Sequence, residues 1–323
     1  MESLNKIRFG IIGCGNIARR FSQALNQSAH AELFACAARD EERAKVFAKE
    51  YGAQKSYGSY QAILEDQDVD AVYIATVHST HAQIAKDCIR AGKPLLCEKP
   101  FFINSSEAQE VIELGRERGV LMMEGFWTRT QPAYLKVKEW ISEGRIGEAR
   151  LIRAAFCFPV PYSEATKSSR LWNPQLGGGA LLDAGVYPYM YVTGLMGGPP
   201  QDFTAMVQRV DSGVDMSVIM CMRYPGLLAD CLTSIAGCMD DSAIISGTQG
   251  YIKQHRFLGS RKAELYNQRG ELVDSFSDPV EEGFIHEIDH FVQLIRSKDL
   301  ESPLIPLADT LDFARKVDYI SCQ

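Results

Sequence analysis

The 323-residue sequence lacks the patterns that mark several classes of protein. No stretch of about eighteen consecutive apolar residues is present, so a membrane-spanning helix is not expected. The nine cysteines include no CxxC pair, and this argues against a zinc framework or a disulfide scaffold. There is no internal repeat and no run of basic residues, which argues against a solenoid and against a nucleic-acid-binding surface.

The composition is that of an ordinary acidic globular enzyme. Apolar residues make up 46% of the chain, charged residues 23%, and the formal net charge is −7. No apolar leader precedes the first strand pattern, so we expect a reduced, cytoplasmic protein. The length exceeds the usual size of a single hydrophobic core, and we therefore expect two domains.

The first part of the chain alternates strand and helix signals. Such alternation is typical of a parallel sheet covered by helices on both faces. Helix 105–118 has a well-defined start, because Asn104 can cap it and Glu107 can reach back. Strands are expected near 6–12, 31–37, 69–76, 94–98 and 121–125, and helices near 16–27, 40–51, 79–91 and 105–118.

The pattern changes after Phe126. Short turns such as Tyr224-Pro225-Gly226 join successive strand-like runs and predict a largely antiparallel sheet. The chain is therefore expected to be α/β, with a parallel-sheet domain at 1–125 and an α+β domain at 126–323, whose last helix is a candidate to dock back on the first. The expected elements are a helix near 132–143, strands at 149–158, 203–211, 214–224, 227–237, 242–247 and 262–266, and helices at 284–297 and about 307–320.

A glycine turn, Gly13-Cys14-Gly15-Asn16-Ile17-Ala18, follows the first strand pattern and opens a helix pattern. In this context Gly13 permits the tight turn, Gly15 lets a pyrophosphate approach the backbone, and Ala18 allows close helix packing. The helix N-terminus supplies partial positive charge. The motif predicts a Rossmann domain that binds a dinucleotide, although a purely structural strand-to-helix turn has the same pattern.

The end of the second strand favours NADP over NAD. NAD-binding domains normally carry an acid here for the ribose hydroxyl, whereas this strand ends Ala37-Ala38-Arg39, with Arg43 one helical turn later. Two guanidinium groups suit a 2′-phosphate. NAD is the alternative cofactor, because Asp40 could bind the ribose and the arginines could be a solvated face.

Two later segments supply candidate site residues. Glu98-Lys99-Pro100 ends an apolar run, and proline keeps Lys99 extended at the strand's carboxyl end, where open α/β sheets bind ligands. Thr76 and His78 lie in a loop that would pass the nicotinamide and ribose. His81 is either part of the same site or an ordinary helix-start residue that bonds the backbone.

Several motifs together resemble the Gfo/Idh/MocA oxidoreductases. They are the GxGxxA turn, the Thr76–His81 loop, Ala91-Gly92-Lys93-Pro94, Glu98-Lys99-Pro100, the segment Glu124–Arg129, and Gly177–Tyr187. The resemblance covers nearly the whole chain. Tyr187, in place of a commoner histidine, is similar to the branch that oxidises cyclic trans-diols and sugars.

The resemblance implies a Rossmann domain, then a domain with an open sheet that is often used for dimerisation, so we expect a homodimer. It also implies that the Lys99-Pro100 peptide bond can be cis. In the family, the position of Tyr187 is the acid/base residue, and the lysine polarises the reacting oxygen and contacts the cofactor ribose. A neighbouring ammonium lowers the pKa of a phenol, so Lys99 is a reasonable partner for Tyr187.

Other residues are assigned on weaker grounds. Asp183 lies four residues before Tyr187, on the same face of a helix, and could orient the substrate or Lys99; it could also complement a helix dipole. Phe126, Trp127 and Arg129 are candidates for the substrate pocket wall, although the two aromatics are equally consistent with plain core. Arg170, Trp172 and Asn173 are candidates for substrate selection.

The sequence predicts an NAD(P)-dependent dehydrogenase that acts on a sugar, a polyol or a cyclic trans-diol. His286 and His290 have the spacing of metal ligands, but no third ligand accompanies them, and we predict no metal. Two other functions stay open at this point: a non-catalytic NAD(P)-binding sensor and a redox-assisted glycosidase of the same family.

Overall fold

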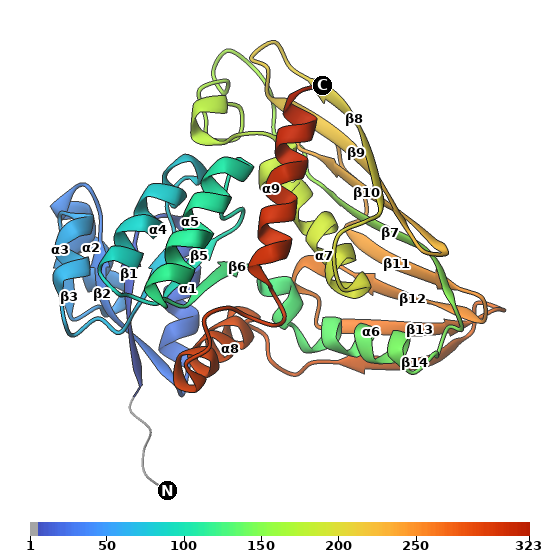
Figure 1. Cartoon of the computed structure of the whole chain (residues 1–323), viewed down its shortest axis with the longest axis horizontal. Coiled ribbons are helices and arrows are strands. Elements are labelled where there is room, and N and C mark those ends of the chain that lie inside the picture. Colours follow the sequence, from blue (N-terminus) through green and yellow to red (C-terminus); the bar gives the residue numbers. More distant parts are fainter. Residues whose placement is uncertain (1–5) are drawn as a thin grey trace, which may run out of the picture. The chain divides into compact units, whose positions relative to one another are not determined.

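The computed structural model describes residues 6–323, which fold into two compact units (Figure 1). The first unit contains the described residues up to Gly125 together with Phe284–Leu311. The second contains Phe126–Gly283 and Asp312–Gln323. Among the described residues, no helix is long and apolar enough to cross a membrane.

The first unit is built on a six-stranded parallel sheet of order β3-β2-β1-β4-β5-β6. The order reverses beside β1, and the edge where β1 and β4 end is the place where such sheets bind ligands. The strands are β1 (Ile7–Ile12), β2 (Ala31–Ala37), β3 (Lys55–Tyr57), β4 (Ala71–Ile74), β5 (Leu95–Glu98) and β6 (Met122–Gly125). The helices are α1 (Asn16–Gln27), α2 (Glu41–Tyr51), α3 (Tyr60–Glu65), α4 (His81–Arg90), α5 (Ser105–Arg118) and α8 (Phe284–Ser297).

The predicted parallel sheet is therefore confirmed, while β3 and α3 were not predicted. Both are short, at three and six residues, and too brief to show a clear period. The central strands are buried on both faces, as parallel strands covered by helices require; all four residues of β4 are buried, and Tyr73 stacks on Phe21 of α1 at 3.7 Å between ring centroids.

Helix α8 joins the first unit from far along the chain. Its Phe291 lies 5.9 Å from Phe9 and its Phe284 5.9 Å from Phe21, measured between ring centroids. The second domain expected from sequence ran without a break over residues 126–323. In the structure α8 lies in the first unit, because its apolar face is buried against α1 and β2. Periodicity predicted this helix but could not tell which core it would join.

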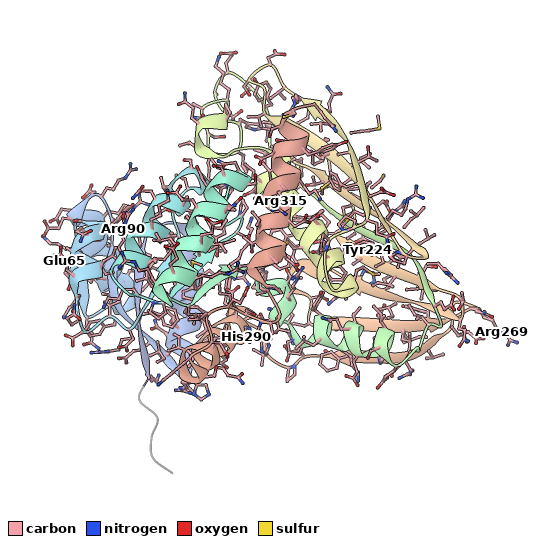
Figure 2. The ribbon with its side chains drawn as sticks, in the orientation of Figure 1. Glu65, Arg90, Tyr224, Arg269, His290 and Arg315 are labelled. Atoms are coloured by element: carbon pink, nitrogen blue, oxygen red, sulfur yellow. The ribbon has the colours of Figure 1, made fainter. Side chains whose placement is uncertain are left out.

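The second unit is built on an eight-stranded sheet of order β14-β13-β12-β11-β7-β10-β9-β8. Every neighbouring pair is antiparallel except β7 with β10, so the largely antiparallel prediction is confirmed. The strands are β7 (Ala149–Cys157), β8 (Asp202–Arg209), β9 (Asp215–Tyr224), β10 (Leu227–Ser234), β11 (Ser242–Gly247), β12 (Gly250–His255), β13 (Lys262–Asn267) and β14 (Leu272–Ser277). Strands β12 and β14 were not predicted; Figure 2 labels Arg269 at the tip of the β13–β14 hairpin.

Helices cover one face of this second sheet. Helix α7 (Val186–Met196) packs on β7 and β10, and α6 (Pro132–Ser142) packs on β13 and β14. Helix α9 (Leu307–Ser321) places its later turns beside β8, where Tyr319 meets Phe203 at 5.5 Å between ring centroids. Nearly all of α7 is buried, so this helix is a rigid support for the residues at its start.

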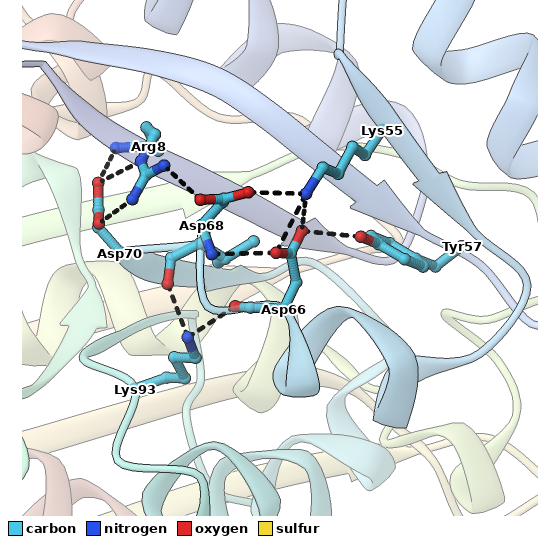
Figure 3. A network of polar contacts seen from close by, with 8 residues as sticks. Arg8, Lys55, Tyr57, Asp66, Asp68, Asp70 and Lys93 are labelled. Carbon is cyan, nitrogen blue, oxygen red and sulfur yellow. Dashed lines mark hydrogen bonds and ion pairs between the residues drawn. The ribbon is translucent and has the colours of Figure 1, made fainter.

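A polar network closes the amino-terminal edge of the first unit's sheet (Figure 3). Asp66 is central, because its carboxylate accepts hydrogen bonds from Lys55 Nζ at 3.0 Å and from the Tyr57 hydroxyl at 2.7 Å. Arg8 bridges Asp68 and Asp70 at 3.0 and 3.1 Å. The members of this amino-edge network that Figure 3 labels are Arg8, Lys55, Tyr57, Asp66, Asp68, Asp70 and Lys93.

Candidate active site

The glycine turn after β1 has the geometry that a dinucleotide-binding turn needs. Gly13 has φ +100°, and a Cβ there would lie 2.7 Å from the carbonyl oxygen of Ala75, so only glycine fits. At Gly15 a Cβ would meet nothing nearer than 3.9 Å. The protein itself leaves this position open, as expected where a ligand approaches the backbone. Ala18 is fully buried beneath the turn.

The N-terminus of α1 is left open for an anion. Gly15 occupies the N-cap and provides no side-chain hydrogen bond, and the first turn, which includes Asn16 and Ile17, contains no acid. By contrast, α2 is capped by Asp40 and α5 by Asn104. Uncapped backbone N–H groups at a helix N-terminus bind phosphate well, and α1 alone of these three helices offers them.

The end of β2 presents arginines rather than an available acid. Asp40 Oδ1 accepts the backbone N–H groups of Glu42 and Arg43 at 2.9 and 3.2 Å, so it is engaged in capping α2. The Arg43 guanidinium donates to the carbonyl oxygen of Cys14 at 2.9 Å and thus lies against the glycine turn. Ala38 is buried and Arg39 is exposed beside it.

His81 ties together two loops at the carboxyl edge of the sheet. Its Nδ1 lies 3.0 Å from the carbonyl oxygen of Pro100, and its Nε2 lies 3.2 Å from that of Thr76. Burial lowers the pKa of His81 to about 4, so the ring is neutral and donates to one carbonyl at a time. Of the two interpretations from sequence, this geometry favours the backbone-bonding one. His78 is buried next to it, with the ring centroids 5.8 Å apart.

Buried acidic side chains accept hydrogen bonds from the turn that carries Lys99. The Lys99-Pro100 bond is cis, as the resemblance implied. Glu98 accepts a hydrogen bond from the Tyr73 hydroxyl and lies 3.3 Å from the Lys99 backbone N–H. Glu124 accepts the Phe101 N–H at 3.0 Å. The backbone of the turn at Lys99–Phe101 is therefore held by acids of β5 and β6, and Tyr73 of β4 holds Glu98. From sequence, Glu98 was a candidate site residue and Glu124 was only part of a motif.

A third buried acid lies near these two. Glu287 on α8 is fully buried, and neither carboxylate oxygen has a hydrogen-bond partner. Burial, together with the charges of Glu98 and Glu124, raises its pKa well above the usual range. Burial also raises the pKa of Glu98, against the opposing effects of Tyr73 and Lys99. Periodicity predicted α8 but could not show that Glu287 would face this cluster.

In the second unit, Tyr187 lies between two aromatic rings at the start of α7. The ring centroids of Phe126 and Phe156 are each 5.6 Å from that of Tyr187, and Tyr187 is 9% exposed. Phe156 comes from β7 and was not singled out from sequence, because a strand phenylalanine looks like ordinary core. An apolar environment disfavours the phenolate form, so a base at this position would need a cation nearby to lower its pKa.

Asp183 lies in a π-helical turn, Leu181–Gly185, that leads into α7. Such single π turns are rare and occur frequently at functional sites. The carboxylate accepts a hydrogen bond from the Arg170 guanidinium at 2.8 Å, with Asp183 mostly buried and Arg170 exposed. Two residues predicted separately from sequence, Asp183 and Arg170, thus form one ion pair.

Three other candidate residues make contacts within the second unit that stabilise the fold. The Arg129 guanidinium is 1% exposed and donates to the carbonyl oxygen of Met190 and to Thr193 Oγ1. Asn173 caps the short turn Pro174–Leu176. Trp127 packs against Gly259 and Gly283. These contacts favour structural roles for Arg129 and Asn173, and their contact with substrate stays a prediction.

No group of three or more histidine, cysteine or acidic side chains within residues 6–323 is arranged to hold a metal ion. Of the two histidines singled out on α8, His290 has another partner, since its Nε2 lies 2.7 Å from Ser302 Oγ.

Family models match both units. Residues 7–126 match the GFO_IDH_MocA model, described as an oxidoreductase family with an NAD-binding Rossmann fold, and residues 134–253 match the GFO/IDH/MocA C-terminal domain. Among curated proteins, the chain is 33% identical over 313 residues to trans-1,2-dihydrobenzene-1,2-diol dehydrogenase of Mus musculus, covering 94% of this chain and 92% of that protein. The Homo sapiens protein of the same name is 33% identical over 332 residues, covering 96% of each.

Solved structures give the same result. A 3-ketoreductase from Actinomadura kijaniata, crystallised with NADP and TDP-benzene, is 31% identical, with a TM-score of 0.85 over 97% of this chain and 96% of that one. Levoglucosan dehydrogenase in complex with NADH and levoglucosan superposes with a TM-score of 0.86 over 98% of this chain and 96% of that one. At 21% identity, the latter likeness concerns the fold alone.

Proposed function

Because the chain belongs to the Gfo/Idh/MocA oxidoreductases and has their NAD(P)-binding Rossmann domain, we propose that it is an NADP-dependent dehydrogenase. Its substrate is a secondary alcohol on a sugar, a polyol or a cyclic trans-diol. The main observation behind the proposal is that the N-terminus of α1, directly after the glycine turn, has no side-chain cap and can bind a phosphate. In addition, Tyr187 lies between the rings of Phe126 and Phe156. The names of its relatives, trans-1,2-dihydrobenzene-1,2-diol dehydrogenase and a 3-ketoreductase, support oxidation and reduction between an alcohol and a ketone.

The residues that would hold the cofactor are those at the carboxyl edge of the first sheet. Backbone groups of Gly13–Ala18 would receive the pyrophosphate, and Arg39 with Arg43 the 2′-phosphate. Thr76 and His78 would lie along the ribose and nicotinamide. Glu98 supports the turn that presents Lys99. When bound, NADP accepts hydride at the nicotinamide C4 during alcohol oxidation.

Tyr187 is proposed as the acid/base residue and Lys99 as its partner. Removing the hydroxyl proton requires a base, and a free tyrosine titrates near 10, which is too high for neutral pH. An ammonium nearby stabilises the phenolate and lowers that pKa. Asp183 lies in the turn that leads into the helix of Tyr187, and its ion pair with Arg170 is proposed to orient the substrate hydroxyls. Phe126 and Trp127 would present an apolar wall to the ring of a sugar or diol.

A substrate panel with a matched pair of variants tests the proposal. Aldoses, inositols and cyclic trans-diols are incubated with NADP, and reduced cofactor is followed by its absorbance. Tyr187→Phe should lower kcat by about 10²–10⁴-fold and leave NADP affinity nearly unchanged. The control is Tyr191→Phe on the same helix, where the hydroxyl is committed to Gln254 at 2.7 Å.

Three outcomes would contradict parts of this proposal. Near-normal turnover in Tyr187→Phe removes the acid/base assignment. No reduced cofactor from any alcohol, with NADP still bound, favours the sensor; turnover of a glycoside without release of reduced cofactor favours the redox-assisted glycosidase.

We also propose that the chain forms a homodimer through the open face of the eight-stranded sheet. Leu151, Met206, Ile219 and Leu228 are 45 to 76% exposed, and the strand register puts all four on one face. Exposed apolar side chains gathered on one sheet face mark an interaction surface. A monomeric mass by light scattering would contradict the dimer. A cytoplasmic location stays a prediction.

A further inference from the structure

We propose that Asp215, a residue to which no role was assigned above, is a positioning residue for the reaction. Its carboxylate holds the start of the π-helical turn Leu181–Gly185, and through that turn sets the position of Asp183 and Tyr187. This inference rests on the proposed function and concerns the second unit alone.

The central contact is between a buried carboxylate and an open helix end. Asp215 begins β9 and is 8% exposed. Its Oδ2 accepts the backbone N–H of Leu181 at 2.6 Å. The first N–H groups of a helix have no partner within it, and a carboxylate from elsewhere in the fold can satisfy them. Asp215 therefore fixes the entry of the segment that leads to Tyr187.

The glycines before this turn explain how the carboxylate reaches it. Gly179 has φ +121°, and a Cβ there would lie 2.3 Å from Asp215 Oδ1. A Cβ on Gly178 would lie 2.6 Å from the carbonyl oxygen of Leu171 and 2.7 Å from that of Arg170. Any side chain at these two positions would displace either the carboxylate or the backbone of the 170–173 loop.

These contacts connect Asp215 with the Asp183–Arg170 ion pair. Gly179 N–H donates to the Leu171 carbonyl oxygen at 2.9 Å, and Asp183 N–H donates to the Gly179 carbonyl oxygen at 3.1 Å. The loop that supplies Arg170 and the turn that supplies Asp183 thus meet at one glycine, and Asp215 lies against that glycine. A shift of the carboxylate would be transmitted to both members of the pair.

Burying a carboxylate is energetically unfavourable, and this supports a specific role for Asp215. Burial raises the pKa of Asp215 to about 6, and the rise is opposed by the N–H groups of Leu181 and Ala180 and by the charge of Arg209. Buried carboxylates are unfavourable unless they make hydrogen bonds that the fold needs. Thr233 Oγ1 completes the arrangement by donating to the Ala180 carbonyl oxygen at 3.3 Å.

The test compares Asp215→Asn with Asp278→Asn. Asp278 is a matched control, because it is 4% exposed in the same unit and accepts the Val280 N–H at 3.1 Å. Turnover is measured with D-xylose and trans-1,2-dihydrobenzene-1,2-diol, and NADP binding by fluorescence quenching. We expect kcat to fall about 10²-fold in Asp215→Asn, since displacements of about 1 Å cost that much. Asp278→Asn should keep kcat, and both variants should keep the NADP Kd.

A double variant separates positioning from general damage. If Asp215 acts through Tyr187, adding Asp215→Asn to Tyr187→Phe should lower the residual kcat by less than about twofold, because residues that act as a unit are not additive. Amide exchange measured by mass spectrometry should rise over residues 180–187 in Asp215→Asn and stay unchanged in Asp278→Asn. Asp215→Ser, which removes the buried charge without adding volume, replaces Asp215→Asn if that protein does not fold.

Three results would overturn the inference: normal kcat in the folded Asp215 variant, an unchanged exchange rate over 180–187, or a fully additive loss in the double variant. Failure of the proposed function is distinguishable from these results, because the wild-type protein itself would then produce no reduced cofactor from any alcohol; normal turnover in Tyr187→Phe alone would reject the acid/base assignment.

Discussion

The two edges of the parallel sheet in the first unit differ in how their polar groups are satisfied. At the amino edge, side chains pair with one another, as in the bonds between Lys55, Tyr57 and Asp66 (Figure 3). At the carboxyl edge, the turn at Gly13 and the uncapped start of α1 leave backbone groups open. The polar groups of the amino edge are paired within the protein, whereas the carboxyl edge leaves backbone groups available to a ligand. Substitutions at the two ends of one strand should therefore affect stability at one end and turnover at the other.

Strand β5 allows the sharpest test, because a lysine flanks each of its ends. Lys99 follows its carboxyl end and Lys93 precedes its amino end. Replacing Lys99 with Met should lower kcat by about 10²–10⁴-fold, since the proposed partner of Tyr187 is lost. Unfolding in urea should change little. Steady-state kinetics and denaturation of the same preparation measure both, and a variant that melted early with its turnover intact would break the comparison.

The cofactor preference gives the next largest effect. Arg39→Ala should weaken NADP binding about tenfold or more, the loss expected for a hydrogen bond to a charged group, and leave NAD binding nearly unchanged. Arg90→Ala is the control, because this exposed arginine at the end of α4 pairs with Asp87 at 3.0 Å (Figure 2). Competitive saturation kinetics with both cofactors provide the readout; a wild-type preference for NAD would contradict the assignment.

The lysine at the other end of β5 should behave in the opposite way. Lys93 is buried and donates to the carbonyl oxygens of Asp66 and Val69, each at 2.8 Å. Burial lowers its pKa, against the charges of Asp66 and Asp70. Lys93→Met should reduce the free energy of unfolding by about 1–3 kcal/mol, because buried carbonyls lose their donor. Its kcat should equal that of the wild type once folded protein is counted.

The smallest expected effect is the pH dependence of the free energy of unfolding that comes from the amino-edge network. Burial acts to raise the pKa of Asp66, but hydrogen bonds from the Asp68 N–H, Tyr57 and Lys55 outweigh it, and the pKa lies below its usual value. Such a group stabilises the fold above its unfolded pKa of about 3.9, and that stabilisation is lost as the pH falls through the folded value. Asp66→Asn should therefore cost up to about 1 kcal/mol at pH 7 and less at pH 3. Urea titrations at both pH values measure the difference, which should not grow in acid.

Most of the fold followed from periodicity, and part of the site did not. The glycine turn, the Lys99 strand end and the long helices have strong local signals, and their elements are confirmed. Short elements such as β3 and α3 carry too few residues for a period to emerge. The buried contacts of Tyr73, Glu124 and Glu287, and the proximity of Phe156 to Tyr187, arise from packing between distant segments. Local patterns do not encode that packing.

The discontinuity of the first unit has a consequence for synthesis. Its hydrophobic core includes Phe284 and Phe291, which emerge from the ribosome only after all eight strands of the second sheet. The nascent Rossmann segment must therefore wait, with Phe9 and Phe21 incompletely covered, while the whole second sheet is made. N-terminal domains commonly fold first during synthesis. Here the unit that begins first is completed only after the second sheet has been made, so a chain truncated after residue 283 would leave the core of the Rossmann unit without α8.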